Sequence, residues 1–78
     1  MVVDSSALSA LLFGEEGWER FAAALASPGR KHMSALNRLE AAIVVEARKG
    51  EAGAKALSAL LAHAGIEVLP FDSGQAEI

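Results

Sequence analysis

The order of apolar and polar residues predicts a short N-terminal strand followed by two helices. Residues 1–3 are a β-type apolar run, and polar residues follow it directly. Ser5 or Ser6 is a suitable N-cap for a short helix, which Gly14 ends. A second helix is expected over residues 15–26, because its apolar residues recur at the i, i+3, i+4 and i+7 positions of one face.

The second half of the chain repeats this alternation of strand and helix. The elements expected there are a brief strand over residues 31–33, a helix over 35–49 capped by Ser34, a helix over 51–64, a strand over 66–71 and the start of a further helix capped by Asp72. Gly50 separates the two longer helices. Strands joined through helices need crossover connections, so the predicted fold class is α/β with a parallel sheet.

Length and composition limit the core that this chain can form. The 78 residues are 53% hydrophobic, but 17 of them are alanine, which fills little volume. They form at most one domain, and a domain of this size has a thin margin of stability. The scarcity of large apolar side chains indicates a partner surface, an oligomer, or a chain that forms only part of its fold.

Cysteine content indicates the cellular compartment, and net charge limits the kinds of partner that the chain can bind. The chain has no cysteine, which is typical of proteins in a reducing compartment, and we expect a cytoplasmic location. Its N-terminal apolar stretch, residues 7–13, is too short to cross a bilayer, so no membrane partner is expected. The formal net charge of −3 gives no overall positive field, so binding of nucleic acid would require a local basic patch or a metal ion.

Glu40 is the first candidate for a functional residue. On a helical wheel it falls inside the apolar stripe that we expect to be buried, which comprises Leu36, Leu39, Ile43 and Ala47. A carboxylate on a buried face is costly unless it is paired, hydrogen-bonded or bound to a metal. Two structural explanations stay open. Either Asn37 caps the helix and Glu40 completes a capping box, or Glu40 forms a partly buried salt bridge.

Asp4 favours a functional explanation of Glu40 over the structural ones, because Asp4 follows a predicted strand. Ligands of α/β folds bind outside the C-terminal ends of parallel strands, and Asp4 and Ser34 occupy such positions after the first and second strands. We therefore expect Asp4, Ser34 and Glu40 to converge at one edge of the sheet. Two converging carboxylates favour a hard cation such as Mg²⁺.

Four segments together resemble the PIN-domain family and, within it, the VapC-type toxins. They are VVDSSALSALL, ERFAAALA, MSALNRLEAAIVVEAR and GIEVLPFD, which match in order and spacing over essentially the whole chain. The resemblance implies a three-layer α/β/α sandwich with a parallel sheet and a ribonuclease that depends on Mg²⁺ or Mn²⁺. It also implies that Asp4 is the first catalytic and metal-binding acid, and that Glu40, which follows Ser34, is the second.

The resemblance implies partners as well as an activity. The expected function is an endoribonuclease toxin of a toxin–antitoxin pair, with RNA as substrate and a cognate antitoxin and a second copy of the chain as partners. Ser5 and Ser34 are expected to contact the substrate or to support the metal ligands. The family's further acids follow the strand over 66–71, so we expect residues 1–78 to be a single PIN-like domain that is incomplete at its C-terminus. The alternative is a truncated, non-catalytic module that binds an antitoxin or self-associates.

Overall fold

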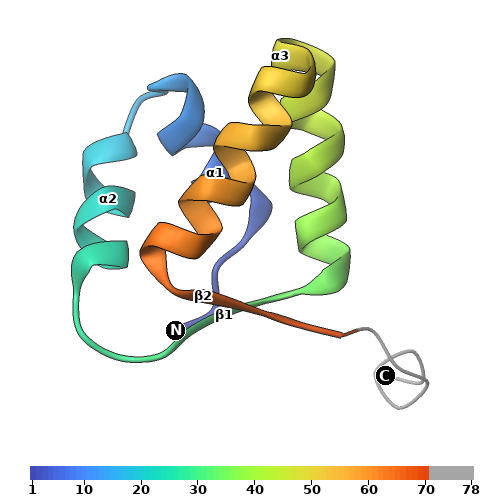
Figure 1. Ribbon diagram of the computed structural model, residues 1–78. Helices are drawn as coiled ribbons and strands as arrows, with labels where there is room; N and C mark the ends of the chain where they lie inside the picture. Colours follow the sequence, from blue (N-terminus) through green and yellow to red (C-terminus); the bar gives the residue numbers. More distant parts are fainter. Residues whose placement is uncertain (71–78) are drawn as a thin grey trace.

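The computed structural model describes residues 1–70, in which strands and helices alternate (Figure 1). The elements are α1 (Ser5–Phe13), α2 (Trp18–Ala26), β1 (Lys31–Ser34), α3 (Ala35–Ala64) and β2 (Ile66–Leu69). The predicted α/β class is confirmed. The helix expected from Asp72 lies outside the described residues. Within residues 1–70, no helix is long and apolar enough to span a membrane.

The sheet is parallel, as predicted, and the N-terminal segment extends it on one side. β1 pairs with β2 in parallel register. On the other side of β1, Val2 lies opposite His32 in a parallel bridge. The Val3 amide donates to the His32 carbonyl at 2.8 Å, and the His32 amide donates to the Met1 carbonyl at 3.0 Å. The order across the sheet is therefore residues 1–3, β1 and β2.

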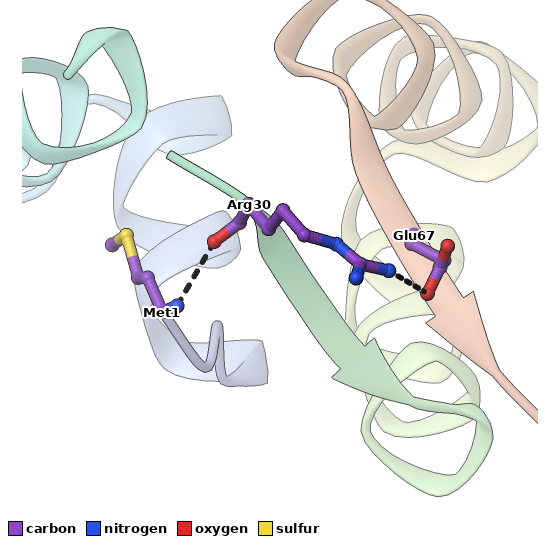
Figure 2. A network of polar contacts seen from close by, with 3 residues as sticks. All are labelled: Met1, Arg30 and Glu67. Carbon is purple, nitrogen blue, oxygen red and sulfur yellow. Dashed lines mark hydrogen bonds and ion pairs between the residues drawn. The ribbon is translucent and has the colours of Figure 1, made fainter. Parts of the chain in front are cut away.

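Polar contacts join the starting ends of the three strands. Figure 2 shows the Met1 ammonium group donating to the Arg30 carbonyl at 2.9 Å, while the Arg30 guanidinium pairs with Glu67 of β2 at 3.5 Å. Both side chains of this ion pair are exposed, so the pair adds little to stability. These contacts lie at the N-terminal ends of the strands. The candidate site lies at the opposite, C-terminal ends.

All described helices lie on the same face of the sheet (Figure 1). The chain steps in one direction from residues 1–3 to β1 and then to β2, so right-handed crossovers place every helix on one side. Val3 and Met33 face that side and are 1% and 0% exposed, whereas Val2 on the other side is 70% exposed. The second helical layer of the expected sandwich is therefore not among residues 1–70.

The first two helices begin at residues other than those expected. α1 is capped by Asp4 rather than by either of the serines that follow, because the Asp4 side chain accepts a hydrogen bond from the Ala7 amide. α2 begins at Trp18, since Gly17 adopts a left-handed conformation with φ 88° and interrupts the helix expected from residue 15. The cap on α1 fixes the Asp4 carboxylate between the first strand and the first helix.

α3 is a pair of helices that turn at Gly50, as the sequence predicts (Figure 1). Gly50 has φ 60° and ψ −145°, a conformation that is accessible to glycine and costly for other residues. The two halves approach closely because Gly53 has no side chain. A Cβ atom there would lie 2.6 Å from Val45 Cγ1 and 2.7 Å from the Val45 carbonyl oxygen. This contact holds the first half of α3 in place.

The buried face of the first half of α3 is opposite to the one that we expected. Its buried residues are Ala41 and Val45, at 0% and 1% exposed. The expected stripe faces outward, with exposed fractions of 53% for Leu36, 55% for Leu39 and 61% for Ile43. Both faces of this helix are apolar, and the face with small residues permits the close contact with Gly53. The prediction that Glu40 lies on a buried face is therefore wrong.

Candidate functional site

Asp4 and Ser34 lie level with each other at the C-terminal edge of the sheet. Val2 is opposite His32 in the parallel bridge, so the same register brings Asp4 beside Ser34 two residues later. Adjacent strands are about 4.8 Å apart. The preceding residues, Val3 and Met33, are fully buried, so the backbone at Asp4 and Ser34 is anchored to the core. Continued from this bridge, the register puts both residues at the C-terminal ends of neighbouring strands, where the sequence predicted them.

The two carboxylate oxygens of Asp4 have different surroundings. Oδ1 accepts a hydrogen bond from the Ser6 hydroxyl at 2.7 Å and another from the Ala7 amide at 3.0 Å. Oδ2 accepts neither of these two hydrogen bonds, and the backbone amide of Ser6 is a further, weaker donor to the carboxylate. The Ser6 hydroxyl, and after it the Ala7 amide, lower the pKa of Asp4 below its ordinary value of 3.8. Asp4 is therefore a fixed, ionised carboxylate with one oxygen free to bind a cation.

Ser34 is the N-cap of α3, as predicted. Its Oγ accepts a hydrogen bond from the Asn37 amide at 3.1 Å and a second from Asn37 Nδ2 at 3.3 Å. Asn37 is thus the third residue of the helix rather than its cap, which contradicts the capping-box explanation of Glu40. Ser34 is half-buried, so its hydroxyl is held at the sheet edge.

Glu40 is an exposed carboxylate on α3, six residues after Ser34 and about 9 Å further along the helix axis. It forms none of the salt bridges found within residues 1–70, so the salt-bridge explanation is also wrong. An exposed glutamate needs no structural partner. The earlier argument for a function, which assumed that Glu40 is buried, therefore no longer applies. The argument for Glu40 as a metal ligand rests on the resemblance to the family.

Ser6, rather than Ser5, is the serine that contacts Asp4. Its hydroxyl donates to Oδ1 at 2.7 Å, whereas the side chain of Ser5 forms no hydrogen bond within the described part of the chain. The sequence allowed either serine to orient the carboxylate. The choice depends on the helix start, because a cap at Asp4 puts the second residue of α1 beside the capping oxygen. Asn37, which the sequence suggested as a helix cap, instead donates two hydrogen bonds to the hydroxyl oxygen of Ser34.

The described residues fit part of a magnesium site. Mg²⁺ prefers oxygen ligands and keeps several waters, and the carboxylate of Asp4 suits this preference. No group of three or more histidine, aspartate or glutamate side chains in residues 1–70 is placed to hold a metal ion. Asp4 is thus a suitable first ligand in a site that needs further donors.

Comparison with known proteins identifies the family. Residues 1–78 match the family model described as PIN domain. Similar proteins include the VapC ribonuclease Mb0640 of Mycobacterium bovis and Ribonuclease VapC30 of Mycobacterium tuberculosis, each 40% identical over 77 residues. Ribonuclease VapC of Mycolicibacterium smegmatis is 39% identical over 77 residues.

These relatives are longer than the chain. Each match covers 99% of the chain but only 59% of the first two relatives and 60% of the third, so the chain spans about three-fifths of their length. The family model covers every residue, and the observed order of parallel strands and helices agrees with the predicted fold class. The resemblance seen in the sequence is confirmed: the chain belongs to the PIN-domain family.

Proposed function

We propose that this chain provides part of the active site of an endoribonuclease toxin, which hydrolyses RNA phosphodiester bonds with Mg²⁺ or Mn²⁺. The observation that carries the proposal is the arrangement of Asp4, whose carboxylate is fixed at the sheet edge with one oxygen free. The names of the relatives, which are VapC ribonucleases, support the same activity. Glu40 is the second proposed metal ligand, and Ser34 the proposed contact to the RNA.

Each proposed residue has a separate task. When bound, the metal ion would polarise the scissile phosphate and make water a better nucleophile. Asp4 would contribute the fixed negative charge that holds the ion, and its lowered pKa keeps that charge at neutral pH. Ser6 would maintain the orientation of Asp4 through its hydrogen bond of 2.7 Å. Ser5 stands next to Asp4 in sequence and is the proposed further contact to substrate.

The 78-residue chain by itself should bind the metal weakly and cleave RNA slowly or not at all. Mg²⁺ that is held by sparse ligands keeps its waters and is poorly positioned. Hydrolysis needs the metal, the phosphate and the water in a closely defined arrangement. A cleavage assay of the chain on RNA with Mg²⁺, repeated with a chelator, tests this expectation. Robust cleavage that the chelator abolishes would show that the site is complete in these residues.

A pair of substitutions separates the metal-binding role of Asp4 from its capping role. Asp4→Ser keeps an N-cap oxygen for the Ala7 amide but removes the free carboxylate oxygen. Asp4→Ala removes both, and should lower the free energy of unfolding by about 1 kcal/mol. We expect both variants to lose Mn²⁺ binding in a calorimetric titration, while Asp4→Ser melts close to the parent temperature. Mn²⁺ affinity that is unchanged in Asp4→Ser would refute the proposed function.

A second candidate function is a non-catalytic module that binds an antitoxin or a second copy of the chain. The observation that favours it is the outward stripe of Leu36, Leu39 and Ile43 on α3, each more than half exposed. Contiguous exposed apolar residues usually mark contact surfaces. Sedimentation of the chain over a range of concentrations tests for self-association, and Asp4→Ser should leave that association unchanged. A protein that self-associates and does not bind Mn²⁺ would favour this second function.

A further inference from the structure

Both acceptor positions of the Ser34 hydroxyl oxygen are occupied by one residue. A serine oxygen has two lone pairs for accepting hydrogen bonds and one O–H group for donating. Asn37 fills the first lone pair through its amide, at 3.1 Å, and the second through Nδ2, at 3.3 Å. The O–H group has no acceptor among the described residues. Ser34 is thus left with a hydrogen-bond donor and with no free lone pair.

This arrangement restricts what Ser34 can bind. A metal ion needs a lone pair of its ligand, and both lone pairs of Ser34 already accept hydrogen bonds. An anionic oxygen needs a donor, which Ser34 has. Asp4 stands level with Ser34 on the neighbouring strand and offers the opposite chemistry, because its Oδ2 is free to bind a cation. The two side chains at this sheet edge are therefore specialised, one for a cation and the other for an anion.

We propose that Asn37 is a positioning residue, which makes Ser34 a hydrogen-bond donor to a phosphate oxygen of RNA and keeps it from ligating the metal. The inference rests on the proposed function, because it assumes that the sheet edge beside Asp4 receives RNA. Asn37 lies in the first turn of α3, where a Glu or Gln side chain usually reaches back to the backbone amide of the cap. The Asn37 amide group reaches the cap hydroxyl instead and sets the direction in which that hydroxyl donates.

Asn37→Asp is the most direct test, because aspartate has the size of asparagine but accepts where asparagine donates. The Ser34 hydroxyl would then donate to the new carboxylate and would no longer be available to donate to a phosphate oxygen. We expect the affinity for a fluorescent single-stranded RNA of about 12 nucleotides, measured by anisotropy with Mn²⁺ present, to fall about tenfold. Asn37→Ala, which removes only the Nδ2 contact, should lower that affinity about threefold.

The negative charge of Asn37→Asp also repels RNA, and Ser34→Ala provides the control for this effect. In the Ser34→Ala background, Asn37→Asp should reduce RNA affinity by a clearly smaller factor than it does in the parent. An equal factor in both backgrounds would overturn the inference, because the substitution would then act only through charge or folding. Asn37→Ala carries no charge and tests the same coupling if Asn37→Asp does not fold. Circular dichroism identifies which variants are folded.

Metal affinity gives the second measurement. Ser34→Ala should leave Mn²⁺ affinity within about twofold of the parent, as expected of a residue that donates to an anion. A loss of Mn²⁺ affinity as large as that of Asp4→Ser would make Ser34 a metal ligand and overturn the inference. The proposed function fails separately, when Asp4→Ser leaves Mn²⁺ affinity unchanged. A parent chain that binds no RNA at any Mn²⁺ concentration overturns both.

Discussion

Gly53→Ala should destabilise this protein, although the same exchange stabilises most helices. Glycine in a helix interior costs about 0.5–1 kcal/mol relative to alanine. The added Cβ, however, would lie 2.6 Å from Val45 Cγ1, 2.7 Å from Lys49 Cβ and 2.7 Å from the Val45 carbonyl oxygen. Non-bonded carbon atoms prefer separations of about 3.5–4.0 Å. The two halves of α3 must therefore move apart by roughly 1 Å, estimated from that preferred separation.

The expected magnitude follows from these opposing effects. Overpacking of this kind costs about 1–3 kcal/mol, and the contact with a backbone oxygen favours the upper part of that range. After subtraction of the helix-propensity gain, the net loss is about 1–2 kcal/mol. For a domain of this size, each kcal/mol corresponds to a fall in Tm of about 4–8 °C. Thermal unfolding followed by circular dichroism should thus show a Tm at least about 4 °C below the parent.

Two further variants calibrate this result. Ala59→Gly, at an exposed position of the same helix, measures the propensity difference alone and should cost about 1 kcal/mol. Val45→Ala combined with Gly53→Ala should be less unstable than the sum of the two single losses, because it removes the Cγ1 contact. A Gly53→Ala protein that melts at or above the parent temperature would refute the reasoning and show that the helices are not in close contact at Gly53.

The remaining predictions concern the site, the outward stripe and the turn of α3. Because the folded pKa of Asp4 lies below its ordinary value of 3.8, its contribution to stability is complete above that pH and is lost as the pH falls through the folded pKa. Urea unfolding at several pH values should therefore show a steeper loss of stability below about pH 4 in the parent than in Asp4→Ser. Glu40→Gln should leave metal-free stability within about 0.5 kcal/mol, as expected at an exposed position, and weaken Mn²⁺ binding; a clear metal-free loss would give Glu40 a structural role instead. Ile43→Lys, at a side chain that is 61% exposed, should change Tm little but reduce self-association in sedimentation; association as strong as in the parent would exclude the stripe. Gly50→Ala should lower the free energy of unfolding by about 1–3 kcal/mol in urea titrations, because the backbone conformation there is strained for alanine; a neutral effect would contradict that strain.

The linear order of elements was determined by sequence. Local features of the sequence predicted the strands, the turn at Gly50 and the cap at Ser34. These features are glycines that end helices, capping residues that follow strands, and helical periodicity. The parallel sheet followed as well, because strands joined by helices leave little alternative. The positions of Asp4 and Ser34 at strand ends then indicated the edge of the sheet at which both residues lie.

Tertiary structure decided which surfaces are buried and which atoms are free. Periodicity shows that a helix has an apolar face, but it does not choose between two apolar faces. In the first half of α3, Ala41 and Val45 are buried, because Gly53 allows the second half to approach on that side. The larger residues of the outward stripe are exposed. Hydrogen-bond direction was likewise beyond the sequence. The sequence did not distinguish between Ser5 and Ser6 beside Asp4, and it suggested Asn37 as a cap rather than as a donor to Ser34. Only the packed helix starts determine which oxygens accept hydrogen bonds.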